Sequence, residues 1–511
     1  MRGQQNFSRK VFSKLNCWPL DLVLHDTSLI RTRPLSPRSS AFLALVLLVL
    51  PTSSACISAK RTPNLERIFR EARTRTGKRP LIVIPGTLGS QLINSKTGEI
   101  VWPSLFRSSE DVLPISTDLA ANRDDLVAGK IIETVRFGKV LPEVYVYRDL
   151  LEALRNYAGY RDGDWNNPGL DGDKDTFYIF SYDWRRDNVE NARELIRKVE
   201  QLKDRLKEPD LRFTILAHSM GGLIARYAAM YGNADLPSGD GEIVPNWAGA
   251  AHISKIVMIG VPNEGSADAF ATIMDGYSIT EGLRRRVPLL NKLTAEDAMR
   301  TPAVYQLLPH RSSARILDEN LKSSLVDLYN PEIWKQYGWS PANDPEFRKR
   351  FARDNSGESS LMKLDLFLAA VLQRARRFHQ ALDAIPESKP PVLLLAIGGD
   401  CEETLDAPVV LRDLKRNRWV TLIRPRSFVT STGKRITKQE VTEAMTAPGD
   451  GRVTRRSLLG EDLTSNRNGG VLASPLAFTY AVFGCDLHGQ LQRNKTLQDN
   501  ALSAVIAEAV K

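Results

Sequence analysis

Short apolar runs alternate with amphipathic segments along most of the chain. The runs have the length and composition of buried strands, and they lie near residues 81–84, 177–180, 213–216, 256–259, 391–397 and 480–484. Segments with a helical spacing of apolar residues lie at 150–157, 189–202 and 223–230. This repeated alternation predicts an α/β fold, with a mostly parallel sheet flanked by helices.

The alternation stops at residue 267 and resumes only near residue 389. Between these points the pattern is helical, rich in aromatic residues and interrupted by prolines such as Pro302 and Pro331. We therefore predict a first part of the core at residues 80–266, an inserted helical cap at 267–388, and a second part of the core at 389–511. Such a cap would cover the site at one end of the sheet.

Residues 1–55 have the features of an N-terminal extension with an export signal. Residues 41–50 form an apolar stretch that is too short to span a bilayer and has the length of a signal-peptide core. Small residues and then Cys56 follow, as at the site where a bacterial lipoprotein is cleaved and acylated. The alternatives are a secreted protein cleaved near Ala55 and an uncleaved anchor. We expect an exported protein on the periplasmic or extracellular side, anchored to the membrane through Cys56.

The net charge of +10 belongs to the N-terminal arm and not to the body. Residues 1–79 hold 15 of the 70 basic and 4 of the 60 acidic residues, which leaves 55 basic against 56 acidic residues for the remainder. The basic residues at 56–79 predict a tether that favours an anionic membrane surface, with a solvated linker as the alternative. Because the body is neutral and has no nucleic-acid-binding motif, we expect no nucleic-acid partner.

The third predicted strand leads into Ala217-His218-Ser219-Met220-Gly221. A strand, one serine among small residues and then a helix are typical of a nucleophile elbow, whose strained turn lifts the serine hydroxyl above the edge of the sheet. Ala217 and Gly221 would let the strand and the helix approach closely. Ser219 as a simple helix cap is the alternative. We predict that Ser219 is a catalytic nucleophile.

A serine nucleophile needs a base, which is most often histidine. Six histidines are present, and only His488 follows the last predicted strand, in a loop before a C-terminal helix. This is the place of the base in folds of the α/β-hydrolase type, where the chain order is serine, acid, histidine. His218 is held on the elbow itself, and we expect it to line the substrate site.

Two aspartates are candidates for the acid that orients His488. Asp400 directly follows the predicted strand at 391–397, and Asp450 lies between Gly449 and Gly451, which let its carboxylate extend toward an imidazole. Either could be an ordinary turn residue. The order of the strands does not choose between them.

The loop after the first strand, residues 85–90, contains two glycines and is where α/β-hydrolases place one backbone N–H of the oxyanion hole. The second N–H comes from the residue after the nucleophile. We assign these roles to the backbone N–H groups of Thr87 and Met220. Leu88, beside Thr87, is expected to line the substrate site.

Six short pieces of the chain, taken together, resemble the lecithin:cholesterol acyltransferase family, including its phospholipase and phospholipid:diacylglycerol acyltransferase branches. In the family's order, they are residues 85–90, 182–185, 217–221, 261–266, 449–453 and 487–489. The resemblance implies an α/β-hydrolase fold, places the acid at Asp450 instead of Asp400, and supports Thr87 and Met220 as the oxyanion residues. The chain departs from the family at Ala217, where many members have glycine, and at residues 452–454, which replace a common Thr-Val-Pro.

The implied activity is that of a lipid acyl-ester hydrolase or O-acyltransferase, such as a phospholipase A, a lipase or an acyltransferase. Ser219 would attack a lipid ester and form an acyl-enzyme, while His488 takes the proton and Asp450 holds the imidazole. The acyl group would pass to water or to an alcohol, a choice that stays open. The expected partner is a lipid in a membrane or lipid surface, and no cofactor is implied. A catalytically silent, membrane-attached lipid-binding lipoprotein is the alternative.

The four cysteines have no zinc-ligand spacing, so no metal site is predicted. Cys401 and Cys485 each follow a late predicted strand. We predict that they form a disulfide, since an exported protein meets an oxidising environment.

Overall fold

The computed structural model describes residues 62–507, except for residues 105–112, 120–122, 136–143, 170–171, 240, 242, 279–291, 386–388 and 462–475. The predicted signal sequence, Cys56 and the first residues of the predicted tether lie outside the described residues. The segment from Thr62 onward forms one compact unit.

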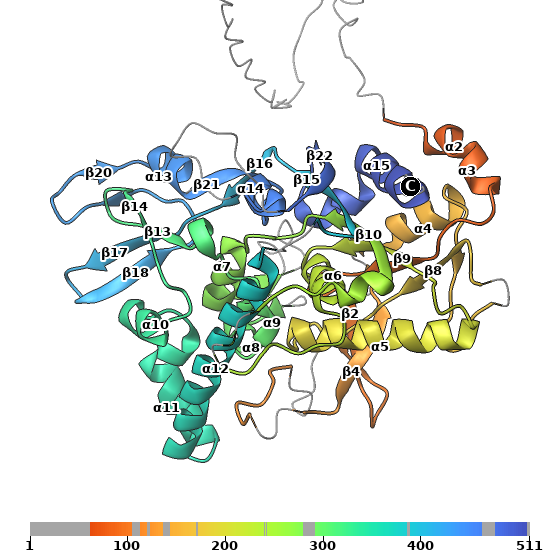
Figure 1. Ribbon diagram of the computed structural model, residues 1–511. Coiled ribbons are helices and arrows are strands. Elements are labelled where there is room, and N and C mark those ends of the chain that lie inside the picture. Colours follow the sequence, from red (N-terminus) through yellow and green to blue (C-terminus); the bar gives the residue numbers. More distant parts are fainter. Residues whose placement is uncertain are drawn as a thin grey trace, which may run out of the picture. The chain divides into compact units, whose positions relative to one another are not determined.

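The core of this unit is a seven-stranded sheet in the order β22-β15-β10-β9-β1-β8-β7, and every neighbouring pair is parallel (Figure 1). Its strands are β1 (Leu81–Ile84), β7 (Arg161–Asp162), β8 (Thr176–Ile179), β9 (Phe213–His218), β10 (Ile253–Ile259), β15 (Leu393–Gly399) and β22 (Phe478–Gly484). Each of the six predicted strands is present. The predicted α/β class and parallel sheet are therefore confirmed.

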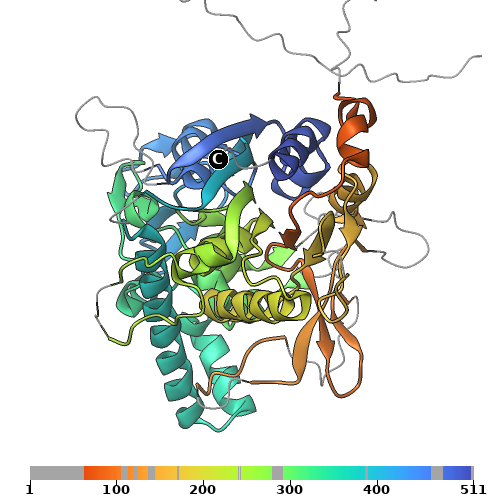
Figure 2. The same ribbon diagram turned by 45° about the vertical axis from the view of Figure 1, so that its right-hand side comes forward.

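Helices cover both faces of the sheet because the central strands are apolar on both sides (Figures 1 and 2). In β1, Ile82 and Ile84 belong to one buried cluster, whereas Leu81 and Val83 belong to another. The first cluster includes residues of α5 (Asn188–Leu206) and α6 (Met220–Tyr231), and the second those of α4 (Arg148–Asn156) and α15 (Lys495–Ile506).

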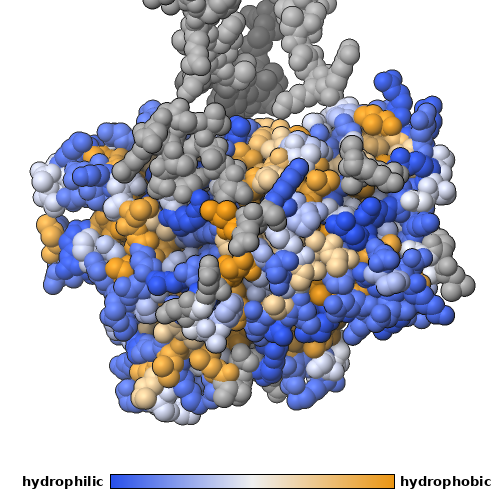
Figure 3. Space-filling view, in the orientation of Figure 1, coloured by the Kyte–Doolittle hydropathy of each residue, from blue (hydrophilic) through white to orange (hydrophobic). Residues whose placement is uncertain are grey.

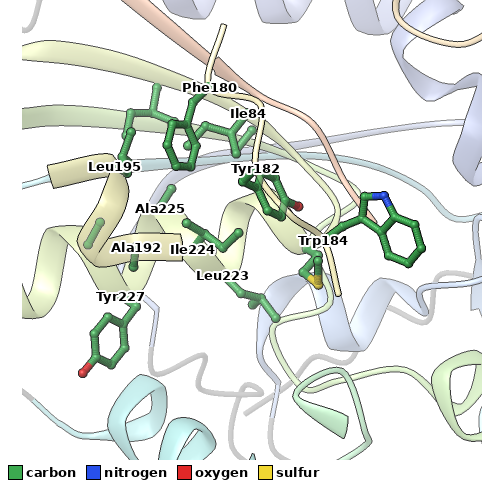
Figure 4. Packing of buried hydrophobic residues seen from close by; sticks show 14 of the residues in the cluster. Ile84, Phe180, Tyr182, Trp184, Ala192, Leu195, Leu223, Ile224, Ala225 and Tyr227 are labelled. Atoms are coloured by element: carbon green, nitrogen blue, oxygen red, sulfur yellow. The ribbon is translucent and has the colours of Figure 1, made fainter. Parts of the chain in front are cut away.

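Small side chains let α5 and α6 pack closely beside the sheet. Ala192 and Leu195 of α5 lie next to Ile224 and Ala225 of α6, below the Phe180 ring (Figure 4). All five side chains are at most 1% exposed. This packing holds α6, and with it the turn at its N-terminus, against the centre of the sheet.

The described part of the predicted tether is packed onto the body. Residues 65–74 form the short helices α2 (Leu65–Ile68) and α3 (Arg70–Thr74). Leu65 and Phe69 are buried in the second cluster, and Lys78 lies 2.7 Å from Asp175 in an ion pair. The basic composition predicted a tether toward an anionic membrane surface, with a solvated linker as the alternative, but two apolar residues four positions apart are enough to dock one turn of helix.

Residues 267–388, which were expected to be helical, contain helices together with short strands. The helices are α7 (Ala267–Asp275), α8 (Ala295–Met299), α9 (Pro302–Tyr305), α10 (Pro331–Tyr337), α11 (Pro345–Asp354) and α12 (Glu358–Asp383). They enclose an aromatic-rich core of their own. The strands are β11 (Tyr277–Ser278), β12 (Lys292–Leu293), β13 (Arg315–Leu317) and β14 (Ser323–Leu325).

Part of the segment expected to complete the core pairs instead with this insertion. Strands β17 (Val409–Asp413) and β18 (Arg418–Leu422) join β13 and β14 in a four-stranded sheet. The two- and three-residue strands of the insertion are too short to show a two-residue period in the sequence.

The remaining elements lie outside the seven-stranded sheet. They are β2 (Ser90–Asn94), β3 (Ile100–Trp102), β4 (Leu126–Ile131), β5 (Thr134–Val135), β6 (Val144–Tyr145), β16 (Glu402–Leu405), β19 (Phe428–Val429), β20 (Arg435–Ile436), α13 (Lys438–Met445), β21 (Thr446–Gly449) and α14 (Arg455–Leu459). The face shown in Figure 3 is mostly hydrophilic, with hydrophobic surface in separate patches. Among the described residues, no helix is long and apolar enough to cross a bilayer.

Cys401 and Cys485 form a disulfide, as predicted, with their Cα atoms 5.2 Å apart. Cys401 lies just after β15 and Cys485 just after β22, the neighbouring strand. The bond therefore links two adjacent strand ends at the carboxyl edge of the sheet.

Candidate active site

Ser219 occupies a sharp turn between β9 and α6, with φ 52° and ψ −129°. A positive φ is unfavourable for a residue with a side chain and marks a strained position. The backbone holds the turn because the Ser219 N–H donates to Ile259 in β10 and the Ser219 carbonyl accepts from Gly222. The Ser219 side chain makes no capping hydrogen bond to α6. The helix-cap interpretation therefore does not explain this serine.

Two glycines allow the segments around Ser219 to approach one another. A Cβ atom on Gly221 would lie 2.5 Å from the Pro85 carbonyl oxygen, and one on Gly86 would lie 2.8 Å from the Cβ of Ser219. Neither separation is possible for a real Cβ contact. A small residue is needed at Gly221, but the close neighbour is the end of β1 and its loop, and not the strand before Ser219 as was predicted. Gly86 has the same role on that loop.

His488 connects Ser219 to Asp450. Its Nε2 lies 3.0 Å from the Ser219 Oγ, and its Nδ1 lies 2.8 Å from Oδ2 of Asp450. His488 begins a short 3₁₀ turn after β22 and is 8% exposed, whereas Asp450 is 1% exposed. The three side chains are thus joined by hydrogen bonds in the order expected for nucleophile, base and acid.

The loop that carries Asp450 orients its carboxylate. Oδ1 accepts hydrogen bonds from the backbone N–H groups of Arg452 and Val453, at 3.0 and 2.8 Å. The Asp450 carbonyl accepts the N–H of His488 at 2.7 Å. Because Arg452 and Val453 act here through their backbone, the departure from the family pattern at residues 452–454 leaves the carboxylate in place.

Asp400, the other candidate acid, has a different environment. Its side chain is 34% exposed and lies 3.6 Å from the Arg455 guanidinium. The order of the strands did not decide which aspartate orients His488. The structure places Asp450, and not Asp400, beside this histidine.

The predicted oxyanion residues lie beside the elbow. The Thr87 hydroxyl is 3.4 Å from the Met220 sulfur, so the loop after β1 meets the first residue of α6. Within the described part of the chain, the backbone N–H groups of Thr87 and Met220 make no hydrogen bond, and an N–H in the first turn of a helix has no partner within the helix. Their role in an oxyanion hole stays a prediction.

The two residues predicted to line the substrate site have other surroundings in the structure. Leu88 is 4% exposed and belongs to the main core cluster, and its carbonyl accepts a hydrogen bond from the Trp102 indole. His218 is 7% exposed and has both ring nitrogens bound within the protein. A motif does not show how deeply its flanking side chains are buried, and this explains the difference.

Tyr147, at the N-terminus of α4, is a site residue that sequence reasoning missed. Its hydroxyl accepts the Gly86 N–H at 2.7 Å and lies 2.8 Å from Nδ1 of His218. Burial raises the pKa of the Tyr147 phenol well above its usual value. Burial and, secondarily, the nearby His488 lower the pKa of His218 to about 3. No local signal identifies Tyr147, because it lies 71 residues from His218 in the sequence.

Two groups of side chains in the described residues have the composition of a metal site. One includes the two disulfide cysteines, whose sulfurs are already bonded. The other consists of Glu264, His310 and Asp383, where Arg311 lies 3.0 Å from Glu264 and 3.8 Å from Asp383. The Arg311 guanidinium compensates the carboxylates, so an ion-pair network accounts for this second group.

The parallel sheet, with a strained serine turn between its central strand and the following helix, defines the fold as that of the α/β-hydrolases. Residues 143–354 match the family model described as lecithin:cholesterol acyltransferase. This match confirms the family resemblance over that part of the chain. No match was found among the curated proteins.

Solved structures similar to this chain include the following three. A chain of the Tle4–Tli4 complex shares 14% identity, with a TM-score of 0.49 and coverage of 84% of this chain and 98% of that chain. The mature lipase BlEst2 of Bacillus licheniformis shares 12% identity, with a TM-score of 0.32 and coverage of 84% and 93%. EstA from Clostridium botulinum shares 15% identity, with a TM-score of 0.31 and coverage of 86% and 91%.

Proposed function

We propose that this protein is a serine-dependent lipid acyl-ester hydrolase or O-acyltransferase that works through an acyl-enzyme on Ser219. The observation that carries the proposal is the hydrogen-bonded series Ser219, His488 and Asp450 at a strained elbow. The match to the lecithin:cholesterol acyltransferase family supports a lipid ester as the acyl donor.

In the first half of the reaction, His488 Nε2 takes the proton of the Ser219 hydroxyl as Oγ attacks the ester carbonyl carbon. The carbonyl oxygen becomes an oxyanion, which the N–H groups of Thr87 and Met220 stabilise. The tetrahedral intermediate then expels the lipid alcohol, which leaves with the proton from Nε2. Asp450 keeps the other imidazole proton on Nδ1 and stabilises the transient imidazolium.

In the second half, water or an acceptor alcohol enters and His488 removes its proton. The new oxygen attacks the acyl carbon, and Ser219 leaves as the neutral hydroxyl after protonation by His488. Hydrolysis and transfer differ only in this nucleophile. The same three side chains therefore serve either outcome, and the acceptor depends on the surroundings of the site.

We also propose that the protein is exported and held at a membrane through Cys56. This part rests on the N-terminal sequence. The disulfide between Cys401 and Cys485 supports an oxidising compartment.

The acyl-enzyme is tested with a fluorophosphonate probe, which phosphonylates an activated serine. We expect stoichiometric labelling of the folded protein and loss of labelling in Ser219→Ala, with the modified peptide containing Ser219. Folded wild-type protein that takes up no label would contradict the proposal and favour a lipid-binding protein without catalysis. Products formed from mixed phospholipid vesicles, with and without a long-chain alcohol, would then distinguish fatty-acid release from ester synthesis by mass spectrometry.

A further inference from the structure

We propose that Tyr147 and His218 are positioning residues that form a buried brace between the oxyanion loop and the loop of the base. Here the brace means the series from the Gly86 N–H through the Tyr147 hydroxyl and the His218 ring to the His488 carbonyl. None of its hydrogen bonds involves the Ser219 hydroxyl, which bonds to His488. The proposal rests on the proposed function, because it assigns a role in positioning the same machinery.

The hydrogens of the brace can be arranged in only one way around a neutral His218 ring. The His488 carbonyl oxygen can only accept, and it lies 3.3 Å from Nε2 of His218, so Nε2 carries the proton. Nδ1 must then accept, and its partner at 2.8 Å is the Tyr147 hydroxyl, which donates. The same hydroxyl accepts the Gly86 N–H at 2.7 Å. Every donor in the series has one acceptor, and no proton is shared.

This arrangement connects two backbone segments on which the reaction depends. Gly86 immediately precedes Thr87, whose N–H is assigned to the oxyanion hole, and the His488 carbonyl belongs to the base itself. Each link in the series is a direct contact of 2.7 to 3.3 Å. A displacement of about 1 Å at such positions is large enough to slow a reaction by about 100-fold.

His218 is suited to this place because it stays neutral. Its ring centre lies 4.8 Å from that of His488, and Tyr147 and Asp450 are the other titratable groups near it. Burial, with a smaller effect of His488, lowers the pKa of His218 to about 3. A charged ring here would repel the imidazolium that forms on His488 during acyl transfer. The neutral ring provides two directed hydrogen bonds without that cost.

Two substitutions of His218 separate its hydrogen bond from its volume. His218→Gln keeps an N–H near the position of Nε2, whereas His218→Met fills similar space without a donor. With a soluble p-nitrophenyl ester, we expect kcat to fall about 10- to 100-fold in His218→Met, as for other misplaced reacting groups, with KM within about twofold of wild type. His218→Gln should recover most of this loss. Tyr147→Phe should behave like His218→Met, since it removes both hydrogen bonds of the hydroxyl.

Tyr160→Phe is the matched control, since Tyr160 is also buried and its hydroxyl donates to a backbone carbonyl, that of Arg79. The proposal is wrong, and the brace has only a structural role, if the fall in kcat is proportional to the fall in the thermal unfolding midpoint and the same proportion holds for all four variants. Unchanged kcat in Tyr147→Phe and His218→Met would overturn it as well.

A second measurement does not need activity. In Ser219→Ala labelled with ¹⁵N-histidine, the His218 resonances, assigned by their loss in His218→Gln, should show a protonated Nε2 and an unprotonated Nδ1 from pH 5 to 8. The opposite tautomer, or a ring that titrates in this range, would overturn the brace. Wild-type protein that resists the fluorophosphonate while His218 keeps the expected tautomer would refute the proposed function and leave the brace standing.

Discussion

The two nitrogens of His488 have different partners, Ser219 on one side and Asp450 on the other. This arrangement requires a proton on Nδ1 and a lone pair on Nε2, the tautomer that a general base needs. The carboxylate of Asp450 imposes it because it can only accept at Nδ1. Asp450 is held in turn by two backbone N–H groups of its own loop.

Replacement of the two candidate acids by asparagine tests this assignment. In Asp450→Asn, the amide can donate to Nδ1 and favour the wrong tautomer, so we expect kcat to fall by about 10³- to 10⁴-fold. Asp400→Asn loses only a partly exposed ion pair with Arg455 and should stay within about twofold of wild type. Steady-state hydrolysis of a soluble ester measures both. Equal losses in the two variants would contradict the role of Asp450.

At the scale of single residues, sequence reasoning identified those candidates that lie in a recognisable local motif or at an expected place in the order of the chain. Ser219 has its elbow, and His488 has its place after the last strand. Tyr147 has neither, and only folding brings its hydroxyl to Gly86 and His218. Leu88 was assigned to the substrate site by adjacency alone, but its side chain is buried in the core.

At the scale of secondary structure, the carboxyl ends of β9, β15 and β22 determine where the site forms. Ser219 directly follows β9, Cys485 directly follows β22, and Cys401 lies two residues after the end of β15. His488 lies three residues beyond Cys485. The disulfide thus constrains the strand end from which the base loop departs.

Removal of this disulfide should destabilise the protein. In the Cys401→Ser, Cys485→Ser double variant, the loss of the cross-link between residues 84 positions apart is expected to cost about 2–4 kcal/mol in the free energy of unfolding. Urea unfolding measures the change. A reductant should lower wild-type stability to that of the double variant and leave the variant unaffected, and an equal stability of oxidised wild type and variant would show that the cross-link contributes nothing.

The elements outside the sheet were harder to predict for a physical reason. A buried parallel strand of four to seven apolar residues stands out against its neighbours, as β1 and β10 do. Strands β13 and β14 have three residues each, and β13 pairs on its other side with β17, from a distant part of the chain. Such pairing depends on which segments meet in space, and periodicity does not report it.

At the scale of the whole unit, buried histidines link the stability of the protein to pH. Burial lowers the pKa of His379 to about 3, with His310 as the next cause, and burial also lowers that of His218 to about 3. Between pH 5 and 6.5, these rings stay neutral in the folded protein but bind protons in the unfolded chain. Because the unfolded state then binds more protons, the free energy of unfolding decreases as pH falls through this window.

His310 has the opposite shift, and the nearby carboxylate of Asp383 helps to raise its pKa above the usual value although burial opposes this. Its contribution is complete below the pKa of the unfolded chain and is lost as pH rises through the folded pKa. Its effect on the pH dependence of stability therefore lies mainly above pH 6.5, where the free energy of unfolding decreases as pH rises.

Urea unfolding at several pH values tests the contribution of His379. We expect wild-type stability to decline from pH 6.5 to pH 5, and the slope to be smaller in His379→Gln by up to about 1 kcal/mol per pH unit, the effect of one proton. His379→Gln lies outside the site, so its ester hydrolysis serves as a check on folding. An unchanged slope would show that His379 is protonated in the folded state.

The sequence alone determined the α/β class and the strands of the core, and it predicted the nucleophile, the base and the disulfide, because each depends on local pattern or chain order. Only the tertiary structure decided which aspartate meets His488 on geometric grounds, where Leu88 and His218 lie, and that Tyr147 joins the site. These depend on distances between residues that are far apart in the chain, and such distances are set by packing.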